Sequence, residues 1–387
     1  DYNRFRSFDS GIGVMPAASV ATPNFFWLGA TSDYEVRSAY FGDAQGTDPD
    51  FEAPSSWRSN LALDLVLDSG YDITIEYNRD SVDTGVFYRD LGLKQSGQMA
   101  DGRGLYDGAG DFWLTNDDQG GATAYTFTVG KSFGDVKLYA AYTNMETTDV
   151  YPLTSTQAES SYGYTQRYDG ENLDAARSSF MVEHKFLATL DYTTQLIGEN
   201  DTRFSLVFVR KSGEPYSVTY DESGYDAYNH QGGQFYADYS LVYVPTGASD
   251  PKVSFKDAAA ATAVMNHVNN TGLSQYKGGI APRNAFTSPY YSRLDLRITQ
   301  DFKVMDGHKV TFYLDMLNLL NYIDDKKGLV KEYSFNNSRQ ILTSGVTSDT
   351  DQPKYILTGV DADDSLFVQN GDGQSAWQMN LGFRYQF

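Results

Sequence analysis

Residues 290–304 read YYSRLDLRITQDFKV, and this stretch decides the fold. Its even positions carry mostly apolar side chains, whereas Arg293, Asp295 and Arg297 occupy successive odd positions. Because successive side chains of a strand point to opposite faces, the stretch predicts a strand with one apolar face and one charged face.

The same alternation recurs along the chain. It is clear in 57–68 and 71–80, which flank the turn at Asp68-Ser69-Gly70 and predict a hairpin. The other segments with this period are 122–133, 136–147, 178–195, 202–214, 308–320 and 376–387. Each spans about 12 residues, compared with ~5–6 for an average strand and ~9–11 for a tilted strand that crosses a membrane. The pattern predicts an all-β, antiparallel transmembrane β-barrel portion of about nine strands; the strand lengths disfavour the alternative, a soluble β-sandwich.

Short and long connections alternate between these segments. Short turns lie at 68–70, 133–135, 198–201 and 305–307, and long connections at 81–121, 148–177, 215–289 and 321–375. This order is typical of outer-membrane barrels, which have tight periplasmic turns and long extracellular loops. Most of the net charge of −21 falls in the long connections and in residues 1–56. Within 215–289, Asp257 followed by four alanines predicts a short capped helix.

Composition excludes several classes of protein. The net charge of −21 argues against nucleic acid as a partner. The absence of cysteine removes disulfides and thiolate chemistry, and only four histidines are present. No run of about 18 apolar residues predicts a transmembrane helix. The chain begins at Asp1 and not at Met, which fits a mature product or a piece of a longer protein.

The chain ends in AWQMNLGFRYQF, in which the aromatic and aliphatic side chains alternate with polar ones. This ending resembles the closing strand of an outer-membrane barrel, whose carboxyl-terminal aromatic residue is read by the barrel assembly machinery. The resemblance implies that Leu381, Phe383, Tyr385 and Phe387 form a barrel-assembly signal.

Longer stretches resemble the carboxyl-terminal barrel of TonB-dependent outer-membrane receptors. They are YYSRLDLRITQDFKV, HKVTFYLDMLNLLN and WQMNLGFRYQF, with PSSWRSNLALDLVLDSGYDITIEYNRDSVDTGVFYRDLGL, SGEPYSVTY, LVYVP and GIAPRNAF upstream. The pattern is most similar to the Oar-like branch, whose precursors often carry a carboxypeptidase-regulatory-like domain ahead of the plug. The resemblance extends from about residue 54 to the end.

This resemblance implies a barrel of about 22 strands, of which 57–387 is the carboxyl-terminal part. Residues 1–56 are then an extracellular loop region, and the plug domain is not in this chain. The implied function is TonB-driven movement of a large or scarce ligand across the outer membrane of a Gram-negative bacterium. The alternative is a structural or adhesive surface barrel without a transport cycle. A passive porin is disfavoured, because its barrel should be complete in one chain.

The same reading sets the expected sites and partners. Arg293, Asp295, Arg297 and Asp315 are expected to face the lumen, and ligand contacts are expected in the four long connections. The residues predict no catalytic site, metal, cofactor or enzyme activity. Residues 361–364 and 370–373 have oxygen ligands that calcium would tolerate, but a solvated acidic loop is the favoured interpretation. His184, His230, His267 and His308 are scattered, and His184 is expected at an interfacial position.

About nine crossings with a periplasmic carboxyl terminus place the residues before Trp57 outside the cell. We therefore expect an amino-terminal barrel and plug portion of the same receptor to pair with the first and last strands of this chain. Contact with the TonB system would run through that portion, and the remaining partner is outer-membrane lipid.

Overall fold

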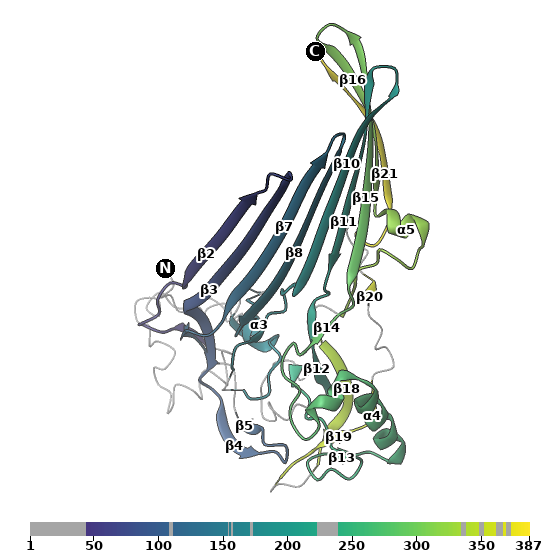
Figure 1. Ribbon diagram of the computed structural model, residues 1–387. Coiled ribbons are helices and arrows are strands. Elements are labelled where there is room, and N and C mark those ends of the chain that lie inside the picture. The colour runs from purple at the N-terminus through teal and green to yellow at the C-terminus, as the bar shows by residue number, and fades with distance from the viewer. Residues whose placement is uncertain are drawn as a thin grey trace, which may run out of the picture.

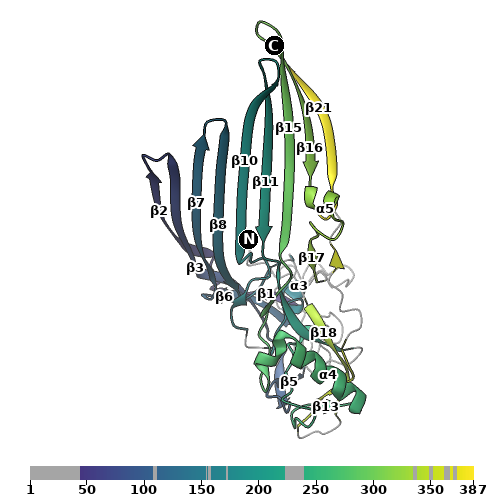
Figure 2. The ribbon, with the colours of Figure 1, turned by 45° about the vertical axis from the view of Figure 1, so that its right-hand side comes forward.

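The computed structural model describes residues 44–107, 111–153, 155, 158–170, 173–222, 239–333, 338–347, 352–360, 367–368 and 373–387. Their dominant feature is a twisted antiparallel sheet of long strands (Figures 1 and 2). In chain order these are β2 (Ser55–Val66), β3 (Tyr71–Asp90), β7 (Gly121–Phe133), β8 (Val136–Asp149), β10 (His184–Ile197), β11 (Asn200–Lys211), β15 (Tyr291–Met305), β16 (His308–Leu317) and β21 (Gln378–Gln386). Each predicted segment overlaps one of these strands, and each strand pairs with the next, so the prediction of a large antiparallel sheet is confirmed.

Short turns join the strands into hairpins at one end of the sheet, and the long connections leave from the other end (Figure 1). Gly134 and Gly198 have φ of 57° and 60°, a left-handed conformation that the tight turns require and that glycine adopts without strain. Phe387 follows β21 at the end of the sheet that carries the turns (Figure 1). The alternation of short and long connections read from the sequence is therefore present in the structure.

Several strand boundaries differ from the prediction, most of all in β3 and β10. β3 continues to Asp90 and there pairs with β6 (Asp111–Asp117), which pairs in turn with β1 (Ala44–Thr47), so 81–121 is not simply a loop. This pairing satisfies backbone groups of β3 beyond the point where β2 and β7 end. β10 begins at His184, because Ser178–Met181 forms a turn. β16 ends at Leu317 and the chain enters α5 (Leu319–Ile323).

The long connections are folded. Their elements are β4 (Lys94–Gln98), β5 (Gly104–Asp107), α3 (Ala158–Gly163), β9 (Ala176–Arg177), β12 (Pro215–Glu222), β13 (Ser254–Phe255), α4 (Ala258–Asn270), the 3-10 helix η5 (Gly272–Tyr276), β14 (Phe286–Thr287), β17 (Lys331–Glu332), β18 (Ser338–Val346), β19 (Tyr355–Leu357) and β20 (Phe367–Val368). Asp257 caps α4 by accepting a hydrogen bond from the Ala260 amide at 2.8 Å, which confirms the predicted helix. No described helix is long and apolar enough to cross a membrane.

A hydrophobic core lies in these connections and not in the long-stranded sheet. We call the described residues of 91–107, 212–289 and 338–360 the cap. Strands β12, β13, β14, β18 and β19 form its sheet, against which α4 buries Val264 and Val268. By contrast, the long strands leave large apolar side chains exposed, with Trp57 at 74% and Leu381 at 77%. The cap therefore buries its apolar residues in a core, whereas the long sheet leaves large apolar residues on its surface.

Candidate functional site

One face of the long-stranded sheet is apolar from strand to strand. Paired positions carry the row Leu190, Leu206, Leu296, Met316 and Met379, and the next row is Tyr192, Phe204, Ile298, Leu314 and Leu381. The sequence predicts the alternation within each strand separately. The register of the sheet then aligns these apolar residues from one strand to the next. We call this face the outward face. Its exposed apolar area needs apolar surroundings, since each Å² left in water costs about 25 cal/mol.

The opposite face, which we call the polar face, carries ion pairs. Arg297 holds Asp315 through two hydrogen bonds, of 2.5 and 2.7 Å, and Arg293 Nε donates to Asp295 at 2.7 Å. Asp295 also accepts from the Asn318 amide at 2.7 Å. The structure thus places all four charges predicted to face a lumen on this one face, paired with each other.

A basic cavity of about 430 Å³ lies on the polar face toward the turn end of the sheet. It is lined by four cationic side chains, those of Arg203, Arg297, Lys309 and Arg384, and by the hydroxyls of Thr299, Thr311 and Tyr313. Asp301 is the carboxylate in its lining and is held by Lys309 at 3.1 Å and Thr311 at 2.6 Å. This cavity could not be predicted from the sequence, because its residues come from strands that are distant along the chain.

The four carboxyl-terminal signal residues share a part of the outward face. Phe383 lies against Phe312 with ring centroids 6.2 Å apart, and the Tyr385 hydroxyl lies 2.5 Å from His308 Nδ1. Phe387 is 92% exposed and stacks on Tyr385 at 5.9 Å. Their arrangement leaves these side chains accessible, and their role in barrel assembly stays a prediction.

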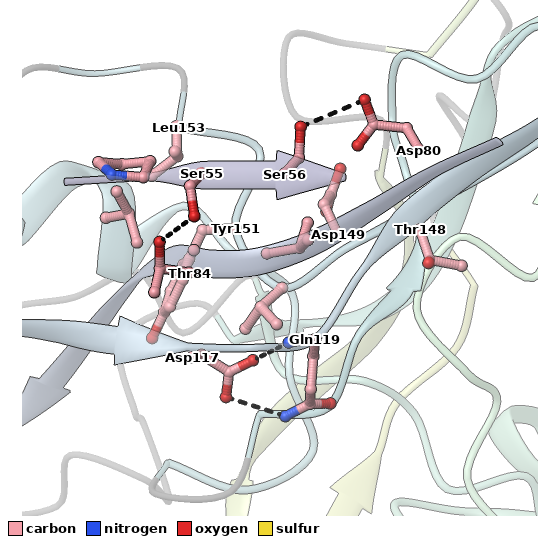
Figure 3. Close-up of a pocket in the computed structure, with 15 residues that line it drawn as sticks. Ser55, Ser56, Asp80, Thr84, Asp117, Gln119, Thr148, Asp149, Tyr151 and Leu153 are labelled. Atoms are coloured by element: carbon pink, nitrogen blue, oxygen red, sulfur yellow. Dashed lines mark hydrogen bonds between the residues drawn. The ribbon is translucent and has the colours of Figure 1, made fainter. Parts of the chain in front are cut away.

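A cavity of about 350 Å³ lies where β2, β3 and β8 pass from the long sheet toward the connections (Figure 3). Hydroxyls and carboxylates line one part of it: Ser55 bonds Thr84 at 2.7 Å, and Ser56 bonds Asp80 at 3.4 Å. The other part is aliphatic, with Val82, Val86, Val150 and Leu153 among its residues. It belongs to the predicted ligand regions 81–121 and 148–177, and it offers a site for a small ligand with polar and apolar surfaces.

Two residues of the GIAPRNAF stretch attach the cap to the sheet. Arg283 donates to the carbonyl oxygens of Asp149 and Val150 at the end of β8 and pairs with the Asp149 carboxylate at 3.0 Å. Burial lowers the pKa of Arg283, and Asp149 opposes that shift. Asn284, with φ of 55°, donates to the Arg177 carbonyl at 2.7 Å.

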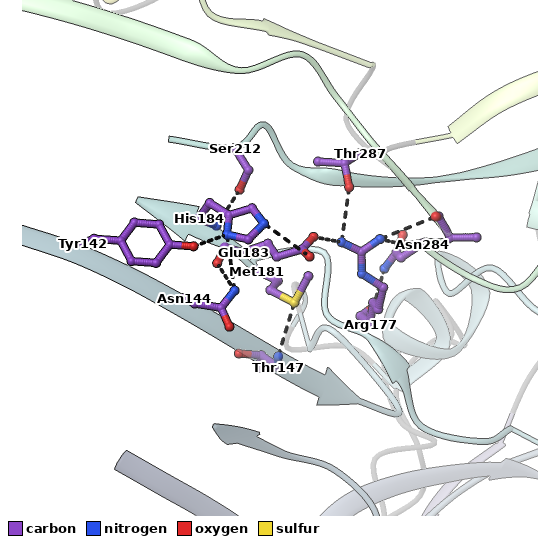
Figure 4. Close-up of polar contacts among 11 residues, drawn as sticks. Tyr142, Asn144, Thr147, Arg177, Met181, Glu183, His184, Ser212, Asn284 and Thr287 are labelled. Carbon is purple, nitrogen blue, oxygen red and sulfur yellow. Dashed lines mark hydrogen bonds and ion pairs between the residues drawn. The ribbon is translucent and has the colours of Figure 1, made fainter. Parts of the chain in front are cut away.

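Arg177 extends this attachment to the first residues of β10. It pairs with Glu183 at 2.8 Å, and Glu183 faces His184 Nε2 at 3.6 Å (Figure 4). His184 itself is partly exposed, as the interruption of its apolar row indicates. The loops of this end are therefore fixed to the strands by side chains that sequence alone reads as ordinary loop residues.

A second attachment centres on Arg103, which is fully buried. Its Nε pairs with Asp101 at 2.8 Å, and its Nη2 donates to the Leu241 carbonyl at 2.8 Å. The guanidinium also lies over the rings of Tyr355 and Tyr220, at 4.9 and 5.3 Å. The β4–β5 hairpin is thus joined to the cap core by a buried cation, and the cap behaves as one packed unit.

Most residues of the two calcium candidates lie outside the part of the chain that the structure describes. Residues 361–364 and 370–372 of the calcium candidates, and His230, lie outside the described residues. Within the described ranges, no cluster of three or more His, Cys, Asp and Glu side chains could hold a metal ion.

A family model described as "Outer membrane beta barrel domain" matches residues 16–324. No curated protein matches the chain. Among solved structures, the siderophore receptor PirA from Acinetobacter baumannii is similar at 11% identity and a TM-score of 0.36, over 72% of this chain and 29% of that one. The chain therefore spans well under half of that receptor.

Proposed function

The chain belongs to the outer membrane beta barrel domain family, and we propose that it forms part of the wall of a receptor that moves a large or scarce ligand across the outer membrane. Membership of this family implies the bacterial outer membrane as its location, and the family is not typically enzymatic. The finer assignment, to the Oar-like branch of TonB-dependent receptors, rests on the sequence stretches that resemble that branch.

One observation carries the proposal: the ion pairs of β15 and β16 lie on the face opposite a continuous apolar face that extends over β10, β11, β15, β16 and β21. In a barrel wall the apolar face contacts lipid and the polar face lines the interior. The cap stands at the end of the sheet away from the turns, so we place the cap outside the cell and the carboxyl terminus in the periplasm. The cavity of Figure 3 is then at the outer mouth.

The edges of the sheet support a larger assembly. Among the described residues, β21 pairs with β16 and β2 pairs with β3, and each has one such neighbour in the long sheet. An open edge within lipid would leave backbone groups without partners, each costing several kcal/mol. We propose that an amino-terminal portion of the same receptor supplies the neighbouring strands and a plug, and that TonB acts through that portion.

Crosslinking tests this assignment. The chain has no cysteine, so a photoreactive residue or single cysteine on the polar face, in place of Arg384, reports only its own neighbours. A crosslink from this position to a folded plug supports transport. The absence of any interior partner, with surface display intact, selects the structural or adhesive barrel. Intact-mass measurement without separation of bound chains shows whether further strands accompany the chain; a solitary 43.1 kDa species that seals a barrel contradicts the assembly.

A further inference from the structure

Three aromatic rings lie in a row on the outward face, at the end of the sheet away from the turns. The ring of His184 stacks on Tyr142, with centroids 6.1 Å apart and an interplanar angle of 18°. It also stacks on Tyr290, at 6.5 Å and 11°. His184 Nδ1 lies 2.8 Å from the Tyr142 hydroxyl (Figure 4). Tyr142 on β8, His184 on β10 and Tyr290, which precedes β15, therefore bring three nearly parallel and partly exposed rings together.

Arg210 completes this platform. Its guanidinium carbon lies 4.9 Å from the centroid of the Tyr290 ring, and Nη1 donates to Ser292 at 3.3 Å. Among the residues that the structure describes, no carboxylate forms an ion pair with Arg210. We call Tyr142, His184, Tyr290 and Arg210 the aromatic shelf. Within the described residues, Arg210 is thus a cation without an anionic partner beside three aromatic rings, whereas His184 faces the Glu183 carboxylate at 3.6 Å.

The shelf lies at the level of lipid headgroups. Arg210 pairs in register with Phe186, so it is on the same face as the apolar rows. β10 has 14 residues, whereas about 9–11 tilted residues cross the hydrocarbon, and His184 is the first residue of this strand. The shelf therefore stands just beyond the hydrocarbon, where the apolar band ends.

The next residue, Lys211, makes a similar contact on the opposite face of the strand. Lys211 lies over Tyr291 at 5.9 Å, so each of two successive residues sets a cation over a tyrosine, on opposite faces of the strand. An unpaired guanidinium binds phosphate through two parallel hydrogen bonds, which suits a phosphate-bearing headgroup. Aromatic faces beside it provide a flat apolar surface for a sugar ring.

We propose that the aromatic shelf binds the phosphorylated sugar headgroup of a glycolipid in the outer leaflet. Arg210 contacts the phosphate, and the rings of Tyr290 and His184 lie against the sugar. This inference depends on the outer-membrane location and on the orientation with the cap outside, and it does not depend on a transport cycle. The loops of the cap are acidic, so they repel a soluble phosphate compound that approaches the shelf from the extracellular side.

Lipid titration tests the proposal. The protein, purified in detergent from outer membranes, is titrated with a diphosphorylated glucosamine-disaccharide lipid, and bound lipid is counted by native mass spectrometry. We expect Arg210→Gln to weaken binding by roughly tenfold, the loss of one charge-assisted contact, and the matched variant Lys211→Gln to leave it within about twofold. Tyr290→Leu gives a second comparison, for which we expect a similar loss, and heat-modifiable gel migration verifies that each variant is folded.

Two further arms identify the source of the anion. The dephosphorylated glycolipid should bind much more weakly, and inorganic phosphate at millimolar concentration should not displace the lipid. The proposal is overturned if the dephosphorylated lipid binds equally well, if free phosphate competes fully, or if Lys211→Gln and Arg210→Gln have equal effects.

Discussion

The ring of Tyr313 lies across Gly382. The two residues face each other in the β16–β21 pair, and a Cβ atom at position 382 would lie 2.3 Å from the Tyr313 hydroxyl oxygen and 2.4 Å from Cζ. The Arg297 guanidinium lies 5.7 Å from the centroid of the same ring and also holds Asp315. The ring therefore links the ion-paired polar face to the last strand, and only a residue without a side chain leaves it that space.

Gly382→Ala is expected to destabilise the pairing of β21 with β16. The added carbon must displace the Tyr313 ring, and overpacking of this kind costs about 1–3 kcal/mol. The fraction of protein that keeps heat-modifiable migration after urea treatment measures the loss. Adding Tyr313→Ser should restore most of it, and Gly247→Ala, which meets nothing within 4 Å, is the control. Equal stability of Gly382→Ala and the parent protein would contradict this account.

Leu296→Arg is expected to impair membrane insertion. Leu296 lies in an apolar row of the outward face, and an arginine there costs ~2–4 kcal/mol near the middle of the bilayer. The matched change is Val207→Arg on the polar face, beside Asp295, which should be tolerated. Folding yield in lipid vesicles compares the two. If Val207→Arg is the more harmful change, the assignment of the two faces is reversed.

Arg103→Leu is expected to loosen the cap without unfolding the barrel wall. It leaves the buried Asp101 carboxylate without its cation, and breaking a buried pair in this way costs about 3–5 kcal/mol. The readout is the rate of protease cleavage within 91–107 and 239–289 on intact cells. Arg103→Leu with Asp101→Leu should cleave more slowly than the single variant, because no unpaired charge remains buried. Loss of heat-modifiable migration in the single variant would show that cap and wall fold together.

Acid is expected to loosen the cap through Asp250. Burial raises the pKa of Asp250, but hydrogen bonds from the amides of Thr246 and Lys252 and the hydroxyls of Thr246 and Tyr243 outweigh it and hold the pKa below the ordinary value of 3.8. A carboxyl whose pKa is lowered by folding stabilises the fold above its unfolded pKa. That stabilisation is lost as the pH falls from about 4 through the folded pKa.

Pepsin cleavage within 239–289, compared at pH 4 and pH 2, measures this effect. Asp250→Asn should raise cleavage at pH 4 and reduce the difference between the two pH values. Burial and the Asp250 hydrogen bond raise the pKa of Tyr243 to about 12, so its phenol stays protonated and remains a donor throughout this range. A pH response in Asp250→Asn as steep as in the parent protein would assign it to other carboxylates.

The long strands could be predicted from the sequence because alternation is local. Side chains such as Leu294 and Arg293 report the two faces of their own strand, and the turn glycines mark where a hairpin reverses. Asp257 before a run of alanines predicted α4 for the same reason, since a cap acts within one helical turn.

The cap could not be predicted in this way. β12 pairs in parallel with β18, more than a hundred residues later, and β13 and β14 have two residues each, too few to show a period. Arg103 stands between glycines in a segment predicted only as part of the long connection 81–121, yet it is fully buried beneath three tyrosines. Its role depends on contacts between distant segments, which no local pattern carries.

Deleting Phe387 is expected to reduce assembly far more than stability. Phe387 is 92% exposed and packs only against Tyr385 among the described ring contacts, so its removal should change the free energy of unfolding of the purified protein by less than about 0.5 kcal/mol. If the aromatic terminus is the assembly signal, the amount of folded protein in the outer membrane should nevertheless fall severalfold. Phe387→Tyr keeps the aromatic ring and serves as the matched control, with near-normal levels expected. Surface levels that are unchanged by the deletion would remove the signal role, whereas a large loss of stability in the purified protein would make Phe387 a packing residue instead.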